Sequence, residues 1–201
     1  MAVILHDGAD EHKDLGMGRR ELSEMRNEES RHAAAALGTE APCFLGYVNL
    51  ASEQKLAAEQ LAEIFLSRRV DALFVPFVLD GHPDHRLANY IAAEALGRVG
   101  GNVRVFGYEV WNFCIANVAI AIPDDVIDLK LRALSCFHLA NKAVNYLWST
   151  KGANMYRSRM LEAGVCNYAE CFFEIPRVEY IALVEAVRNC ETSVRPAMIL
   201  R

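Results

Sequence analysis

The stretch that decides the fold is VDALFVPFVLDGHPDHR, residues 70–86. Its first ten residues are almost all apolar, which is typical of a parallel strand buried on both faces. Pro76 has no N–H to donate to a neighbouring strand, so we expect this strand to end near Val75. A polar loop over residues 80–85 follows. The apolar residues after it recur at helical spacing, which predicts a helix over residues 84–98.

Short apolar runs alternate with helical stretches over the rest of the chain. We expect strands at residues 2–5, 43–47, 103–111 and 118–122, and helices at residues 19–37, 52–69, 129–148 and 178–187. Residues 154–175 show no clear pattern. This alternation predicts an α/β sandwich, with a mostly parallel sheet and helices on both faces. A length of 201 residues predicts a single domain over residues 1–201.

The sharpest local pattern is His82-Pro83-Asp84-His85, at the junction of the predicted strand and helix. Two histidines at this spacing can share one side of the first helical turn, and Asp84 beside them can fix an imidazole tautomer. Ligands of open sheets bind beyond the carboxyl ends of the strands, where this loop lies. The pattern therefore fits a metal and proton-transfer site. The alternative interpretation is a polar turn in which Asp84 is the helix N-cap and both histidines are solvated.

The composition argues against several functional classes. A net charge of −5 disfavours a nucleic-acid partner, because neutralising phosphates needs a basic face. No apolar run approaches the roughly 20 residues that span a bilayer, and the start of the chain turns polar too soon for a signal peptide. The six cysteines form no CxxC pair. We therefore expect reduced thiols and a cytoplasmic protein without a membrane span.

Several segments share their order and spacing with one enzyme family. Residues 80–86 (DGHPDHR) resemble the second motif of the LmbE/PIG-L N-deacetylases. Residues 26–29 (RNEE), with Leu37-Gly38 after them, resemble the family's R-x-x-E…LG helix. Residues 107–111 (GYEVW) and 169–172 (AECF) resemble its later segments. The agreement extends over most of the chain and is more specific than the histidine motif alone.

The resemblance implies a Rossmann-like fold and metal-dependent removal of an N-acetyl group from an amino sugar or glycoconjugate. By this match His85 would be a ligand of the family's metal, usually zinc. His82 would polarise the amide oxygen and then protonate the leaving amine, and Asp84 would orient His82. The residues that the resemblance assigns to substrate binding are Arg26, Tyr108 and Glu109. The alternative interpretation is structural, because a tyrosine and a tryptophan at the end of a strand are equally typical of the hydrophobic core and of the edge of the sheet.

One departure from the family bears on activity. The family's first metal motif, H-P-D-D, has no counterpart in the chain, which starts at about the family's second strand. Without the first strand and helix a sheet edge would be exposed, and a homo-oligomer could cover it. Either the sequence is truncated at its start, or the chain is an inactive member that binds a sugar or a partner subunit. A third interpretation is a rebuilt metal site that uses His6 with Asp7 or Asp10.

Overall fold

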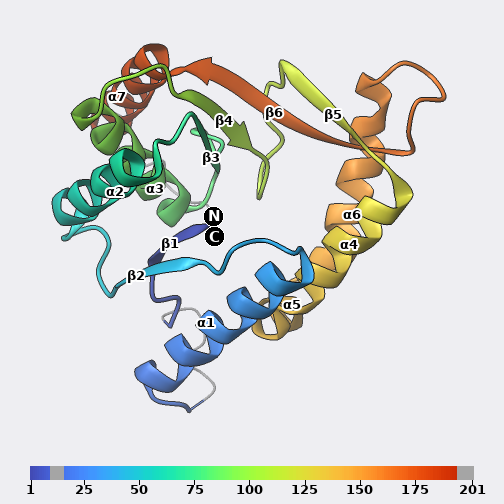
Figure 1. Cartoon of the computed structure of the whole chain (residues 1–201), viewed down its shortest axis with the longest axis horizontal. Coiled ribbons are helices and arrows are strands. Elements are labelled where there is room, and N and C mark those ends of the chain that lie inside the picture. The colour runs from blue at the N-terminus through green and yellow to red at the C-terminus, as the bar shows by residue number, and fades with distance from the viewer. Residues whose placement is uncertain (10–15, 194–201) are drawn as a thin grey trace. The chain divides into compact units, whose positions relative to one another are not determined.

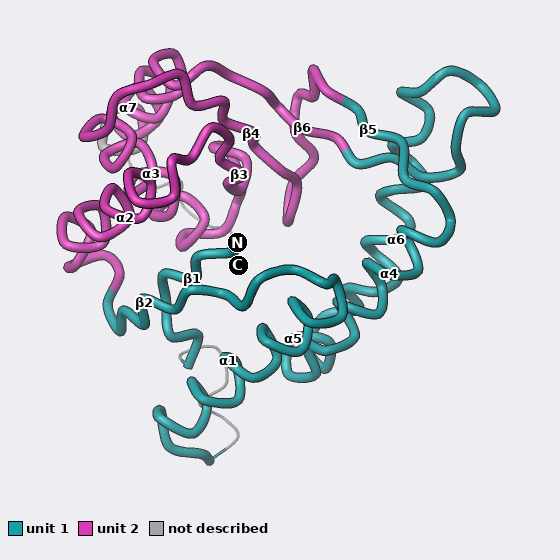
Figure 2. The backbone as a smooth tube through the Cα atoms, in the orientation of Figure 1, with its two compact units in different colours: residues 1–49, 119–170 teal, residues 50–118, 171–201 magenta. Residues whose placement is uncertain are grey.

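The computed structural model describes residues 1–9 and 16–193, and the fold is α/β, as the sequence predicts (Figure 1). The chain divides into two compact units (Figure 2). Unit 1 comprises residues 1–49 and 119–170, and unit 2 comprises residues 50–118 and 171–201. The polypeptide therefore crosses between the units at three points of the sequence. The single domain predicted over residues 1–201 stays a prediction.

Unit 1 begins with two parallel strands joined by a helix. β1 (Val3–His6) pairs in parallel with β2 (Cys43–Tyr47), and α1 (Arg19–Ala36) lies between them in the sequence. Gly38 follows the end of α1 with a φ of 66°, a left-handed conformation that glycine adopts without a steric penalty. The helix between the two strands gives the crossover connection that a parallel pair requires, and Gly38 ends that helix.

Further helical segments complete unit 1. They are α4 (Asp124–Ser135), α5 (His138–Ala143), α6 (Tyr146–Arg157) and the 3-10 turn η2 (Ser158–Met160). α1 packs against α4, and Leu22 of α1 and Ile127 of α4 are both fully buried. The helices of this unit thus share one apolar core.

The sheet of unit 2 places the polar loop at the end of a strand. β3 (Ala72–Pro76) and β4 (Arg104–Tyr108) pair in parallel, so both strands end on the same side of the sheet. β6 (Tyr168–Pro176) pairs antiparallel with β4 through residues 172–176, so the sheet of unit 2 is mixed. β5 (Val118–Ile122) and the start of β6 fall mostly in unit 1. The carboxyl end of β3 leads directly into residues 77–82.

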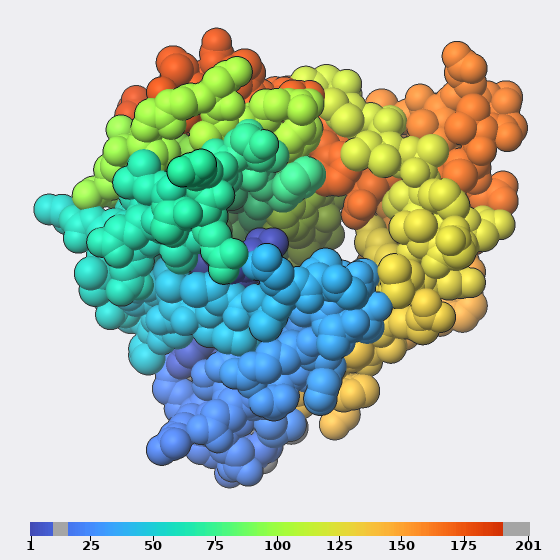
Figure 3. All heavy atoms as spheres, in the orientation of Figure 1, coloured from blue at the N-terminus to red at the C-terminus, as the bar shows by residue number. Residues whose placement is uncertain are grey.

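α3 (Pro83–Arg98) is the central helix of unit 2. It packs against β3, α2 (Gln54–Arg68) and α7 (Arg177–Ser193). Ile91 and Leu96 of α3 are fully buried, at the spacing that the sequence predicts. The outer face of α2 lies at the surface (Figure 3). No helix within residues 1–9 and 16–193 is long and apolar enough to cross a lipid bilayer.

β3 ends at Pro76, so the expectation that the strand ends near Val75 holds to within one residue. The N–H of Phe77 donates to the carbonyl of Tyr108 at 2.8 Å. Because successive residues of a strand direct their N–H groups to opposite sides, the nitrogen of Pro76 faces away from β4. β3 is an edge strand of the described sheet, and an edge tolerates a residue that has no N–H.

Two segments differ from the sequence-based expectation. The single helical stretch expected over residues 129–148 is divided among α4, α5 and α6. Asn145 causes one break, because its side chain accepts the N–H of Trp148 and caps α6. The unassigned residues 154–175 contain the end of α6 and most of β6. β6 pairs with β4, which lies far earlier in the chain, so no local pattern marked it.

Candidate functional site

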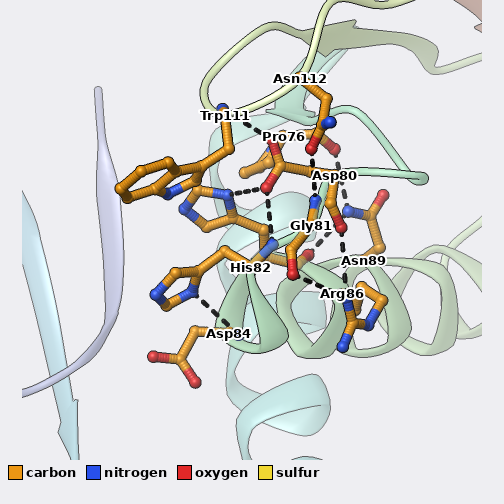
Figure 4. Close-up of polar contacts among 10 residues, drawn as sticks. Pro76, Asp80, Gly81, His82, Asp84, Arg86, Asn89, Trp111 and Asn112 are labelled. Atoms are coloured by element: carbon orange, nitrogen blue, oxygen red, sulfur yellow. Dashed lines mark hydrogen bonds and ion pairs between the residues drawn. The ribbon is translucent and has the colours of Figure 1, made fainter. Parts of the chain in front are cut away.

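The first turn of α3 organises the loop that follows β3. His82 is the N-cap of α3, with φ −79° and ψ 130°, and its Nδ1 accepts the N–H of Asp84 at 3.2 Å (Figure 4). Pro83 stands inside the helix start, where its fixed φ is suitable and its missing N–H leaves no gap. The interpretation of Asp84 as the N-cap was therefore wrong, because Pro83 begins the helix one residue earlier.

Asp80 is the buried acceptor that orders this loop. Its side chain is fully buried. Oδ1 accepts the N–H of His82 and lies 2.9 Å from Nδ1 of His85, and Oδ2 accepts the N–H of Trp111 at 2.9 Å. Burial opposes ionisation of Asp80, but the hydrogen bonds from His82, Trp111 and His85 outweigh it and hold its pKa below the ordinary 3.8. The carboxylate is therefore charged at neutral pH.

These contacts decide which nitrogen of each neutral imidazole carries the proton. Because the Asp80 carboxylate accepts, Nδ1 of His85 is the protonated nitrogen and Nε2 keeps its lone pair. Because Nδ1 of His82 accepts from Asp84, the proton of His82 is on Nε2. The two ring centroids are 4.9 Å apart. The loop thus presents a hydrogen-bond donor on His82 beside a lone pair on His85.

A buried amide supports the arrangement from beneath. Asn89 of α3 is fully buried and donates from Nδ2 to the carbonyls of Pro76 at 2.9 Å and His85 at 2.8 Å. Its Oδ1 accepts the hydroxyl of Tyr180 of α7 at 2.8 Å. Burial raises the pKa of Tyr180, so its hydroxyl keeps the proton that it donates. Asn89 therefore ties the end of β3, the first turn of α3 and α7 together.

The loop after β4 supports the same residues from a second side. The N–H of Gly81 donates to Oδ1 of Asn112 at 2.8 Å, and Nη1 of Arg86 donates to the carbonyl of Gly81 at 3.0 Å (Figure 4). A Cβ at residue 81 would lie 3.1 Å from that Asn112 oxygen, so glycine permits the close approach. Together with the contact between Trp111 and Asp80, these bonds hold the two loops together.

Tyr108 and Glu109, which the sequence analysis assigns to substrate binding, lie at the end of β4. Burial and the nearby charge of Asp80 raise the pKa of Tyr108, so its hydroxyl stays protonated. Oε1 of Glu109 accepts the N–H of Cys114 at 2.8 Å. Glu109 therefore shapes the loop after β4, and both residues belong to the same unit as His82 and His85.

Arg26, the other expected substrate-binding residue, lies on α1 in unit 1. Its Nη1 is 3.3 Å from Oε2 of Glu29, whose carboxylate is buried. Oε1 of Glu29 accepts the N–H of Leu139 at 2.9 Å. The same carboxylate therefore pairs with Arg26 and joins α1 to α5, so Arg26 has a structural partner within its own unit.

The residues considered for a rebuilt metal site also lie in unit 1. Asp7 is buried, and its two oxygens accept Nε and Nη2 of Arg19 at 2.7 and 2.8 Å. Nδ1 of His6 accepts the N–H of Gly8 at 3.0 Å. A metal would have to compete with Arg19 for the Asp7 carboxylate. Asp10 lies outside the described residues.

His85 suits one position of a zinc site. Its Nε2 lone pair, with a carboxylate on the opposite ring nitrogen, is the usual arrangement of a zinc-bound histidine. Zinc takes three or four protein ligands. Across residues 1–9 and 16–193, no three His, Cys, Asp or Glu side chains gather closely enough to hold a metal ion. The described residues therefore fit one ligand of the expected zinc and do not form a complete site.

No local sequence pattern predicted the residues that hold the histidines in place. Asp80 was visible as a polar residue of the loop, although its role as the shared acceptor was not assigned. Asn89 stands one helical turn after His85, and this spacing could have indicated it. Tyr180 and Trp111 have no local signal, because they reach the site from α7 and from the loop after β4.

Comparisons with known proteins find one family model that matches the first half of the chain and several solved structures of similar fold. Residues 1–96 match the family model described as PIG-L: GlcNAc-PI de-N-acetylase. The solved structure of N,N′-diacetylchitobiose deacetylase from Pyrococcus horikoshii is 20% identical with a TM-score of 0.70, and the match covers 89% of this chain and 73% of that chain. No curated protein matches the chain in sequence.

Two further solved structures share the fold. The zinc-inhibited form of teicoplanin deacetylase is 13% identical with a TM-score of 0.64, and the match covers 87% of both chains. GalB, the 4-carboxy-2-hydroxymuconate hydratase from Pseudomonas putida KT2440, is 21% identical with a TM-score of 0.69, covering 86% of this chain and 82% of that chain. At these identities the likeness concerns the fold, which carries more than one reaction.

Proposed function

Because residues 1–96 match the PIG-L family model, we propose that this chain is a PIG-L/LmbE-like deacetylase, which hydrolyses the N-acetyl group of an amino sugar or glycoconjugate. The observation that carries the proposal is the pair of complementary imidazoles held by Asp80 and Asp84. A hydrogen-bond donor beside a lone pair that can bind a metal ion suits amide hydrolysis, because the carbonyl oxygen gains negative charge and the nitrogen must leave with a proton.

His82 is the residue that acts on the amide in this proposal. Its Nε2–H would donate to the amide oxygen, and the proton that the attacking water loses would reach the leaving amine through His82. Asp84 is a positioning residue, since its main-chain N–H occupies Nδ1 of His82 and directs the reactive proton to Nε2. The same proposal assigns Arg26, Tyr108 and Glu109 to substrate binding.

We also propose that the activity depends on a divalent metal, zinc by the family resemblance, with His85 as one ligand. When bound, such a metal lowers the pKa of a water molecule and stabilises negative charge on oxygen. Asp80 keeps Nε2 of His85 available for it by holding the proton on Nδ1. A cytoplasmic location agrees with six free cysteines and stays part of the proposal, as does a homo-oligomer.

The first experiment measures metal content and zinc affinity of the purified chain. We expect the zinc that the parent protein binds to be lost in His85→Ala. His32→Ala is the matched control, because His32 is exposed on α1. A folded parent protein that binds no zinc, or a His85→Ala variant that binds it equally well, would refute the metal assignment.

The second experiment measures acetate release from N,N′-diacetylchitobiose. We expect His82→Gln to abolish release while keeping zinc, because the amide side chain cannot transfer the proton. Acetate is the decisive product, since the fold also carries a hydratase, which would release none. A folded chain that binds the sugar and releases no acetate would instead support the non-catalytic, sugar-binding alternative.

A further inference from the structure

The loop after β4 exposes several large apolar side chains, although hydrogen bonds hold its backbone in place. The apolar loop, as we call residues 110–115, includes Val110, Trp111, Phe113 and Ile115, which are 44%, 51%, 57% and 78% exposed. Several large apolar side chains gathered at the surface usually mark a binding surface. The loop adjoins the candidate site, because the N–H of Trp111 is bound by Asp80.

Hydrogen bonds from within unit 2 hold the apolar loop. Asp80 binds the N–H of Trp111, Asn112 binds the N–H of Gly81, and Glu109 binds the N–H of Cys114. The first two bonds involve the same loop that orders the histidines. The exposed side chains therefore have a set position relative to His82, and such preorganisation reduces the entropy lost when a ligand binds.

The indole of Trp111 is aligned with the candidate proton donor. Its plane is 12° from that of the His82 imidazole, and the ring centroids are 6.2 Å apart (Figure 4). A pyranose ring has faces made of C–H groups, which suit a flat apolar surface, while its polar substituents project from the rim. A sugar lying on the indole could therefore direct its acetamido group towards His82.

We propose that Trp111 is the platform on which the sugar ring of the substrate packs, and that Phe113 and Ile115 extend this surface for the next group along. The proposal rests on the proposed function, because the acetamido group is the one that His82 would act on. It makes Trp111 a residue that determines specificity. Cyclic amino sugars would be preferred over small acyclic amides that lack an apolar face.

The two tryptophans of the chain allow a direct test by fluorescence. Trp148 lies in unit 1 and is 76% exposed. Trp148→Phe leaves Trp111 as the only indole, and we expect its emission to change on titration with N,N′-diacetylchitobiose. In Trp111→Phe the remaining indole should report no change. Circular dichroism checks that each variant is folded.

Affinity supplies the quantitative test. We expect Trp111→Ala to raise the dissociation constant for N,N′-diacetylchitobiose about tenfold, which corresponds to about 1.4 kcal/mol. The N–H that Asp80 binds belongs to the main chain and survives this substitution. Trp148→Ala is the matched control and should leave affinity unchanged. N-acetylethanolamine, which has the amide but no ring, should bind weakly to all variants.

The possible outcomes separate this proposal from the proposed function. Unchanged affinity in Trp111→Ala, equal loss in Trp148→Ala, or no binding of the sugar by the parent protein would overturn the platform. A changed oligomeric state in Trp111→Ala with unchanged affinity would overturn it too, and would make the loop a self-association surface. Binding through Trp111 without acetate release would keep the platform and reject the hydrolase.

Discussion

Replacing Asp80 by asparagine keeps the shape of the buried acceptor and removes its charge. The carboxylate accepts two hydrogen bonds at Oδ1, from His82 and His85, and one at Oδ2, from Trp111. An amide has only one oxygen. In its better orientation that oxygen replaces Oδ1, and the amide nitrogen then opposes the N–H of Trp111, so at least one buried donor loses its partner.

The size of the effect follows from that single lost contact. A hydrogen bond to a charged group contributes about 1.5–3 kcal/mol to stability. We therefore expect Asp80→Asn to lower the free energy of unfolding at pH 7 by about 2 kcal/mol or more. For a chain of this length, about 2 kcal/mol corresponds to a fall in Tm of about 4–8 °C. Zinc affinity should fall as well, because a neutral amide oxygen is a weaker acceptor for the Nδ1 proton of His85 than a carboxylate, which makes Nε2 less basic.

The stability difference between the parent protein and Asp80→Asn should change with pH in one direction only. The folded-state pKa of Asp80 lies below its ordinary value of 3.8. A carboxyl group shifted downwards stabilises the fold above the ordinary pKa, and this contribution is lost as the pH falls through the folded-state pKa. Asparagine has no such contribution. The stability difference between parent and variant should therefore be full near pH 7 and shrink once the pH falls below about 4.

Urea unfolding followed by circular dichroism at several pH values measures this difference. The matched control is Asp128→Asn, because Asp128 is exposed on α4 and its substitution should change stability by less than about 0.5 kcal/mol. Equal stability of Asp80→Asn and the parent protein at pH 7 would refute the reasoning. So would a difference that grows as the pH is lowered.

Other substitutions test separate parts of the structure. Tyr180→Phe removes the hydroxyl that Asn89 accepts and should cost about 1–3 kcal/mol, whereas Tyr156→Phe, at a half-exposed tyrosine, should change stability by less than about 0.5 kcal/mol. Thermal unfolding compares the two, and equal shifts would contradict the buried network. Gly107→Ala would place a Cβ 3.2 Å from an aromatic ring and 3.4 Å from backbone, and a loss of about 1–3 kcal/mol is expected in urea unfolding. Gly152→Ala, inside α6 with open space around it, should stabilise by about 0.5–1 kcal/mol, and a loss there would show that the helix is not the stable state at that position.

The sequence by itself determined the features that depend on near neighbours along the chain. The apolar run before His82 and the periodic helix after it predicted a strand, loop and helix, because a strand's burial and a helix's spacing are local patterns. The same stretch also carried the family resemblance. Pro83 between the histidines indicated a helix start, although the cap proved to be His82 rather than Asp84. The α/β class followed from the alternation of such segments.

Only the tertiary structure decided how the histidines are held. Asp80 accepts hydrogen bonds from both histidines and is itself held by the N–H of Trp111, 31 residues later. Asn89 is held by the hydroxyl of Tyr180, 91 residues later. β6 had no visible signal, because its partner β4 is distant in sequence. Such partners are brought together by strand register and helix packing, and a hydrogen bond depends on distance in space rather than along the chain. The contacts that set the tautomers of His82 and His85 are local, and the fold supplies the distant groups that hold Asp80 and Asn89 in place.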